Sequence, residues 1–269
     1  MQKTILITGS TDGIGLETAK ALVSQGHNIL LHGRNPSKLE AVKSDLSMSG
    51  GRVESYVADL SLMANVEALA SAVAQKHSKL DVLINNAGVY NAQNPLTPEG
   101  LDIRFAVNAI APYLLTQKLL PLLGTSGRVI NLSSAAQSPV NLNALTGQVS
   151  LSDGEAYAQS KLALTTWSRS LALSRKEQGP AIIAVNPGSL LGSKMVKQAF
   201  GIAGSDIRIG AEVLCRAALS DEFSTTSGQY FDNDKGQFAS PHPDALNSQK
   251  TEKLVNTIET ILEKASTSP

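Results

Sequence analysis

Apolar positions fall into two alternating kinds of segment along the chain. Short, almost continuous apolar runs such as "TILIT" (4–8) predict strands that are buried on both faces. Longer stretches with apolar residues on one helical face predict helices between the runs. The predicted strands are 4–8, 28–33, 53–59, 80–88, 127–134 and 181–188, with 228–232 as a candidate seventh. The predicted helices are 14–25, 36–48, 63–77, 99–123, 155–178 and 247–265.

Regular alternation of buried strands and helices predicts an α/β fold with a doubly wound parallel sheet of about seven strands and helices on both faces. The chain has no linker, repeat or low-complexity run, so residues 1–269 are expected to form one domain of the Rossmann type. Ligands of such sheets bind beyond the carboxyl ends of the strands. Two long irregular stretches, 135–154 and 189–207, follow strand ends and are expected to overhang that crevice.

Two features refine the helices. Pro36 suits the first turn of its helix, and Pro112 is expected to kink the helix over 99–123. Within 247–265, one stripe is apolar and the other side carries mixed charges, which favours packing on the body or on a sister subunit over a membrane surface. The apolar stripe consists of Leu254, Val255, Ile258, Ile261 and Leu262.

Composition excludes several classes of function. Hydrophobic residues make up 42% and charged residues 17% of the chain, and the formal net charge is zero, so nothing favours nucleic acid or an anionic membrane as a partner. The four histidines lie apart in sequence, and no metal site is predicted. The single cysteine, Cys215, lies in an apolar stretch and is assigned to the core rather than to nucleophilic chemistry.

Location is predicted from apolar run length. The first apolar run is too short for a signal peptide, and no run of about 18 apolar residues could span a bilayer. We therefore expect a cytoplasmic protein without a membrane span.

The stretch "TGSTDGIG" lies between the first strand and the first helix. Gly9 permits a tight turn, while Gly13 and Gly15 let the backbone approach phosphates at a helix N-terminus, where free N–H groups attract anions. An ordinary turn has the same residue types, but the position after the first strand favours a nucleotide site.

The end of the second strand indicates which dinucleotide is preferred. An acidic residue there would hold the ribose 2′-hydroxyl of NAD, but "HGRNPSK" has none before Glu40. Arg34 could pair with a 2′-phosphate, and Ser10 and Thr11 could add hydroxyls. The pattern favours NADP(H) over NAD(H), with a solvated surface arginine as the alternative reading.

In "YAQSK", Tyr157 and Lys161 are four residues apart and therefore share one helix face. An ammonium near a phenol favours the phenolate, so the pKa of Tyr157 is expected to fall toward the working pH of an acid or base. A partly exposed helical pair is the alternative. Asn108, in an apolar helix, is either a satisfied core amide or a functional one.

Two further strand ends carry candidate residues. "NLSS" ends with Ser133 and Ser134, either of which could hold a substrate oxygen or cap a turn. "NNAG" places small residues where backbone could approach a ribose, although alone it is also a loop pattern.

Together these motifs resemble the short-chain dehydrogenase/reductase family. The motifs, in family order over about 4–234, are "TGSTDGIG", "VADLS", "NNAG", "FAVN", "NLSS", "YAQSK" and "VNPG". The resemblance implies a Rossmann fold and NAD(P)-dependent oxidation of alcohols or reduction of carbonyls. It implies that Tyr157 is the acid or base, that Lys161 lowers its pKa and holds the nicotinamide ribose, and that Ser134 holds the substrate oxygen. Asn108 would fix a water that relays protons to Lys161.

The resemblance also implies a cofactor-binding set. Its members are Gly9, Ser10, Thr11, Gly13, Ile14, Gly15, Arg34, Asp59, Leu60, Asn86, Ala87, Gly88, Tyr157, Lys161, Pro187 and Gly188. Within it the glycine-rich turn and Ile14 embrace the pyrophosphate, Asp59 meets the adenine, and Pro187 and Gly188 touch the nicotinamide side.

A finer likeness is to the retinol-dehydrogenase-like and WW-domain-oxidoreductase-like branch. It rests on "LTPEGLDIRFAVNAIAPYLLTQKLLPLL", on "GQYFDNDKGQFASP", and on the long gap between Ser134 and Tyr157. This branch mostly favours NADP(H). Its membrane-bound retinoid enzymes carry a hydrophobic anchor, whereas this chain starts at the first strand, so retinoid specificity is not expected.

The resulting prediction is an NADP(H)-dependent carbonyl reductase or alcohol dehydrogenase acting on a small apolar substrate. The alternatives are a non-catalytic NADP(H)-binding redox sensor and a reductase of C=C bonds on the same scaffold. The family implies a homodimer or homotetramer.

Overall fold

The computed structural model describes residues 1–48 and 51–267, and its centre is one eight-stranded sheet. The strand order is β3-β2-β1-β4-β5-β6-β7-β8. The first seven strands run parallel, and β8 pairs antiparallel with β7. The strands are β1 (Thr4–Ile7), β2 (Asn28–Gly33), β3 (Val53–Val57), β4 (Val82–Asn85), β5 (Arg128–Leu132), β6 (Ala181–Asn186), β7 (Tyr230–Asp232) and β8 (Gln237–Ala239).

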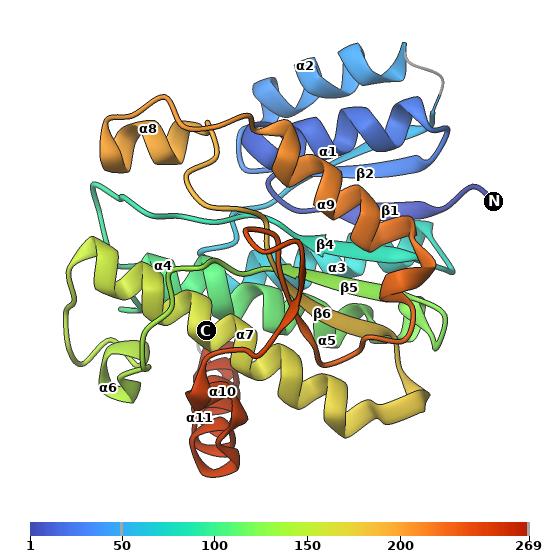
Figure 1. Ribbon diagram of the computed structural model, residues 1–269. Coiled ribbons are helices and arrows are strands. Elements are labelled where there is room, and N and C mark those ends of the chain that lie inside the picture. The colour runs from blue at the N-terminus through green and yellow to red at the C-terminus, as the bar shows by residue number, and fades with distance from the viewer. Residues whose placement is uncertain (49–50, 268–269) are drawn as a thin grey trace.

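Helices cover both faces of this sheet, which confirms the doubly wound Rossmann architecture (Figure 1). One face packs against α1 (Gly13–Ser24), α2 (Pro36–Ser47) and α9 (Arg208–Leu219). The other packs against α3 (Met63–Lys76), α5 (Ala111–Leu123) and α7 (Asp153–Arg175). Strands β1, β4, β5 and β6 contribute residues to both cores, as their continuous apolar runs predict.

The strand β8 and the helix α9 are absent from the sequence-based prediction. The antiparallel β8 was not predicted, because its three residues are too few for a periodic pattern. Helix α9 was also missed, although its apolar residues, including Cys215, pack into the core. The assignment of Cys215 to the core is confirmed, and burial raises the pKa of its thiol to about 11.

The helix predicted over 99–123 consists of three consecutive pieces. They are α4 (Ile103–Phe105), one π-helical turn η1 (Ala106–Ile110) and α5. Pro112 lies two residues after η1 within this continuous helical run, so the irregularity expected at the proline lies in the π-helical turn just before it. The indole N–H of Trp167 on α7 donates to the Ala109 carbonyl of this turn at 3.1 Å.

The chain ends in α10 (Pro243–Leu246) and α11 (Ser248–Thr267), and α11 packs on the body. Leu254, Ile258 and Ile261 of α11 are buried against the core that includes α3 and α7, so the stripe packs on the body, one of the two partners predicted for it. No helix in the described part of the chain is long and apolar enough to cross a membrane.

The two irregular stretches lie at the carboxyl end of the sheet, as expected. Residues 135–154 contain α6 (Leu142–Leu145), and residues 189–207 contain α8 (Lys194–Phe200). Figure 1 shows α6 and α8 beyond the same edge of the sheet, with the first turn of α7 between them. The remaining short 3₁₀ turns are η2 (Lys176–Gln178) and η3 (Asp221–Phe223).

Candidate active site

Helix α7 carries Tyr157 and Lys161 to the carboxyl edge of the sheet. Its start is fixed by a capping box, in which Ser152 accepts from the Glu155 N–H at 3.4 Å and the Glu155 carboxylate accepts from the Ser152 N–H at 3.1 Å. Tyr157 lies one turn inside the helix and Lys161 one turn further, with its Nζ 5.6 Å from the Tyr157 ring centroid. The predicted pair therefore shares one face.

Lys161 is almost fully buried, and its Nζ donates to the Leu132 carbonyl at the end of β5 at 2.7 Å. Burial lowers the pKa of Lys161 to about 8. A side chain added at Gly88 would meet this ammonium, since an ideal Cβ there lies 3.7 Å from Lys161 Nζ and 3.6 Å from Asn108 Oδ1. Lys161, Asn108 and the end of the "NNAG" motif thus converge at one point.

Tyr157 differs from the simple expectation for a tyrosine beside a lysine. Burial raises the pKa of the phenol, a hydrogen bond with Ser134 opposes that rise, and the neighbouring Tyr90 adds to it. Desolvation of the phenolate therefore outweighs the stabilising contact. Lys161 is directed to the Leu132 carbonyl, which explains why the pair alone does not depress the pKa of Tyr157.

The two serines after β5 have different environments. Ser133 is buried, and its hydroxyl is bonded to Thr165 Oγ1 at 2.6 Å inside the core. Ser134 is partly exposed, and its hydroxyl interacts with Tyr157 and accepts from the Ala136 N–H at 3.1 Å. The structure therefore brings Ser134, rather than Ser133, to Tyr157.

Asn108 lies in η1 with its side chain fully bonded. Its Oδ1 accepts from the Val89 N–H at 2.8 Å, and its Nδ2 donates to the Val89 carbonyl at 2.9 Å and to Ser160 Oγ at 3.0 Å. The amide thereby ties the loop after β4 to helix α7. The proton relay through Asn108 remains a prediction.

The glycine-rich turn has the geometry of an anion cradle. Gly9 has φ +64° and Gly13 has φ +58°, a region that disfavours other residues. An ideal Cβ on Gly9 would lie 2.9 Å from Ala87 Cα, and one on Gly15 would lie 2.3 Å from Asn86 Nδ2, so neither position tolerates a side chain. The turn leads into the N-terminus of α1, where free N–H groups suit a pyrophosphate.

The predicted 2′-phosphate contacts separate into two groups. Arg34 is exposed just after β2, and Thr11 lies against the preceding residue, Gly33, since Thr11 Cγ2 is 2.7 Å from an ideal Cβ on that glycine. The Ser10 hydroxyl is fully buried instead: it accepts from the His32 N–H at 2.9 Å and donates to the His32 carbonyl at 3.3 Å. Ser10 Oγ therefore joins the turn to β2 rather than facing Arg34.

The remaining predicted cofactor residues line the same edge of the sheet. Asn86 Nδ2 donates to the Thr8 and Gly9 carbonyls, and the Ala87 N–H donates to Thr8 Oγ1, which joins the end of β4 to the end of β1. The other members of the set are Ile14 in the first turn of α1, Asp59 and Leu60 after β3, and Pro187 and Gly188 after β6.

His32 is a supporting residue that the sequence analysis did not identify. Its Nδ1 accepts from the Gly9 N–H at 3.1 Å, which makes Nε2 the donor to the Ala58 carbonyl at 3.1 Å. Burial lowers the pKa of His32 to about 4, so the neutral ring holds the glycine-rich turn against the ends of β2 and β3.

An aromatic wall beside Tyr157 was also missed. Tyr90 follows the "NNAG" motif, and its ring centroid lies 4.9 Å from that of Tyr157 and 5.6 Å from that of Phe200 on α8. Phe200 is half exposed, and Met195 Cε on the same helix lies near Gly88. Because the wall is assembled from three separate segments, no spacing in the sequence indicates it.

In residues 1–48 and 51–267, no group of three or more His, Cys, Asp or Glu side chains is arranged to hold a metal ion.

Comparisons with known proteins identify relatives along most of the chain. The family model described as short chain dehydrogenase matches residues 3–201. Bovine retinol dehydrogenase 12 is 32% identical, over 94% of this chain and 84% of that protein. A crystal structure of an uncharacterised protein from Mycobacterium paratuberculosis superposes with a TM-score of 0.82 at 28% identity, covering 97% of this chain and 94% of that one. A metagenomic short-chain oxidoreductase in complex with NADP has a TM-score of 0.65 at 30% identity, covering 84% and 94% of the two chains.

Proposed function

The chain belongs to the short-chain dehydrogenase family, in its retinol-dehydrogenase-like branch, and we propose that it transfers a hydride between NADP(H) and a carbonyl or alcohol. The observation that carries the proposal is the convergence of Ser134, Tyr157 and Lys161 at the carboxyl edge of the sheet. These side chains come from the loop after β5 and from α7, and together they supply an oxygen anchor, a proton donor and a cation.

The protein's own groups have distinct roles in the proposed reaction. Ser134 holds the substrate oxygen by a hydrogen bond, and Tyr157 gives its phenolic proton to that oxygen during reduction or takes a proton from it during oxidation. The Lys161 ammonium stabilises the phenolate that results and binds the ribose hydroxyls of the cofactor. The bound nicotinamide supplies or accepts the hydride.

The preference for NADP(H) is inferred from the end of β2. Arg34 is exposed one residue after Gly33, which Thr11 contacts, and residues 34–38 contain no carboxylate that would repel a 2′-phosphate. The NADP complex of the metagenomic relative supports the same preference. Equal or tighter binding of NADH than of NADPH would contradict it.

An apolar substrate is inferred from the surroundings of Tyr157. Tyr90 and Phe200 form one side of the space next to the phenol, and Met195 approaches Gly88 from α8. Apolar and aromatic walls with a few convergent polar groups are typical of sites for small organic ligands. The branch's retinol dehydrogenases do not assign retinol to this chain, and the substrate class proposed is a small apolar ketone, aldehyde or quinone.

The experiment measures NADPH oxidation with a panel of such carbonyl compounds, in wild type and in Tyr157→Phe. Removing the phenolic hydroxyl is expected to lower kcat by about 10²- to 10⁴-fold. Product analysis separates the alternatives, because carbonyl reduction yields an alcohol and C=C reduction does not. Unchanged turnover in Tyr157→Phe would contradict the proposal, and NADPH binding without turnover would favour the redox sensor.

Two wider properties are also proposed. We infer residence in the cytoplasm, as predicted from the sequence, and assembly into a homodimer or homotetramer, as the family resemblance implies. Sedimentation of the purified chain tests the assembly, and a monomer over the working concentration range would contradict it.

A further inference from the structure

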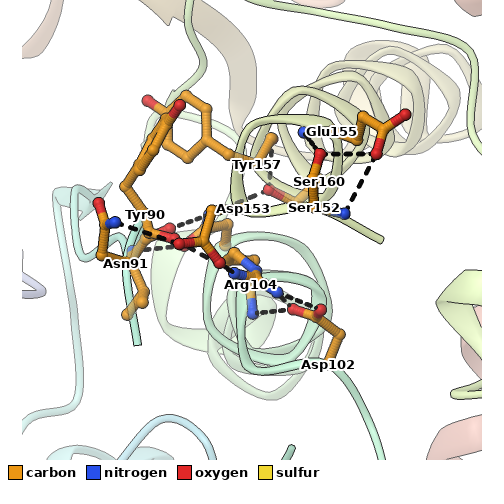
Figure 2. Close-up of polar contacts among 11 residues, drawn as sticks. Tyr90, Asn91, Asp102, Arg104, Ser152, Asp153, Glu155, Tyr157 and Ser160 are labelled. Carbon is orange, nitrogen blue, oxygen red and sulfur yellow. Dashed lines mark hydrogen bonds and ion pairs between the residues drawn. The ribbon is translucent and has the colours of Figure 1, made fainter. Parts of the chain in front are cut away.

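Arg104 is a fully buried arginine that the proposed chemistry does not use. Its side chain is 1% exposed, at the point where α4, the loop after β4 and the first turn of α7 meet (Figure 2). A buried guanidinium is costly unless it is paired and hydrogen-bonded, so its partners indicate what it holds in place.

One side of the guanidinium is fixed by Asp102. Nε donates to Asp102 Oδ1 at 2.8 Å and Nη2 donates to Oδ2 at 2.6 Å, a bidentate pair within α4 and its N-cap. Asp102 is itself buried, and its Oδ1 also accepts from the Arg104 N–H at 2.9 Å. This half of the arrangement is local and orients the arginine.

The other side reaches the catalytic helix. Arg104 Nη1 forms an ion pair with Asp153, the first residue of α7, and approaches the Tyr90 carbonyl at 3.5 Å. Asp153 Oδ2 accepts from Asn91 Nδ2 at 3.1 Å, so one carboxylate bridges the arginine and the loop that carries Tyr90. Figure 2 shows Asp153 between Arg104 and Asn91, with the rings of Tyr90 and Tyr157 beside them.

Tyr90 rests on the same turn of α7. An ideal Cβ on Gly154 would lie only 3.2 Å from the Tyr90 hydroxyl oxygen, and the Tyr90 ring packs at 4.9 Å from Tyr157. The loop after β4 is therefore held against α7 at its backbone, at Asn91 and at the Tyr90 ring.

We propose that Arg104 and Asp153 are positioning residues that lock the first turn of α7 to the Tyr90 loop and so fix Tyr157 against Tyr90. This proposal rests on the proposed role of Tyr157 as the acid or base. The linkage acts through position alone, because neither side chain belongs to the group of Ser134, Tyr157 and Lys161.

The experiment uses Asp153→Ala, because Asp153 is 43% exposed and its removal leaves the buried pair of Arg104 and Asp102 intact. With Tyr157 no longer held, kcat is expected to fall about 10- to 100-fold, while the KM for NADPH stays the same. Asp153→Glu keeps the charge and is expected to recover most of the loss. The matched control is Glu67→Ala, which breaks an ion pair with Lys118 at a residue 42% exposed and should leave kcat unchanged.

A second measurement does not depend on turnover. Hydrogen exchange is expected to become faster in Asp153→Ala at the amides of the Tyr90 loop and the first turn of α7, and to stay unchanged there in Glu67→Ala. If exchange is faster in Asp153→Ala but the wild type itself shows no turnover, the proposed function is wrong and the linkage stands. If the wild type turns over substrate and Asp153→Ala changes neither kcat nor exchange, the proposed linkage is wrong and the proposed function stands. A loss of kcat that Asp153→Glu fails to restore would also contradict the linkage.

Discussion

At the residue scale, several polar side chains near the candidate site bind backbone groups of neighbouring strands and turns. His32 shows this, because its ring satisfies the Gly9 N–H and the Ala58 carbonyl while staying neutral. The sequence shows a histidine in an apolar strand, and nothing in its spacing distinguishes such an anchor from a core residue. Ser10 is a second example: its hydroxyl was predicted to contact a phosphate, but in the structure it is hydrogen-bonded to the His32 backbone of β2.

The His32 anchor makes stability depend on pH. Its folded pKa of about 4 lies below the value of 6.5 for an unperturbed histidine, so the unfolded chain binds a proton more readily. The contribution of neutral His32 is complete above pH 6.5 and is lost as the pH falls toward 4, by roughly 3 kcal/mol.

Urea unfolding at a series of pH values compares wild type with His32→Asn. The variant is expected to be less stable at pH 7 and to show a flatter decline between pH 6.5 and 4. His27, whose pKa burial also lowers, is present in both proteins and provides a common background. Parallel declines in the two proteins would show that His32 is not the neutral anchor.

At the scale of elements, strands and long helices follow from the sequence, whereas contacts between loops do not. The strand ends at Gly9, Ser134 and Asn86 were placed correctly because a parallel sheet brings all carboxyl ends to one edge. The Tyr90 loop, α8 and the first turn of α7 meet through side chains of three separate segments. One sequence carries no periodicity that pairs them, so the aromatic wall could not be predicted.

The contact between the Tyr90 loop and α7 can be tested with Gly154→Ala. The added methyl carbon would lie 3.2 Å from the Tyr90 hydroxyl oxygen, closer than ordinary contact, so the Tyr90 side chain must shift by a few tenths of an ångström where it packs on Tyr157. We expect a loss of kcat of about 10-fold, since small misplacements in an active site are costly.

The matched double variant is Tyr90→Phe/Gly154→Ala. Removing the hydroxyl relieves the contact, so kcat of the double variant is expected to return close to that of Tyr90→Phe alone. Steady-state kinetics compare the wild type, the two single variants and the double variant. Full activity in Gly154→Ala would show that the contact between Tyr90 and α7 has no effect on the reaction.

At the scale of the whole molecule, the alternation of strands and helices predicted the fold class, and the cores agree with it on both faces of the sheet. Helix α11 was predicted from its stripe of apolar residues, but that stripe does not indicate which surface it packs against. The structure shows that it covers the core that includes α3 and α7, with Leu254 and Ile258 buried. The helix therefore contributes to stability through this packing.

Ile258→Ala tests that contribution. The side chain is fully buried, so its truncation is expected to lower the free energy of unfolding by about 2–5 kcal/mol. Glu252→Ala, at an exposed position on the same helix, should change it by less than about 0.5 kcal/mol. Denaturant midpoints measure both variants, and equal midpoints would mean that α11 is dispensable for stability.

The π-helical turn η1 makes the number of residues between α4 and α5 important for the structure. Such a turn accommodates one residue more than an α-helix would, and here the surplus falls at Asn108 and its neighbours. Deleting one residue from 106–110 would restore an unbroken α-helix between α4 and α5, but it would remove the widened turn that places Asn108 and Ala109. Asn108 would then no longer face Val89, and the Ala109 carbonyl would turn away from Trp167. We infer that this segment tolerates substitution better than a change of length.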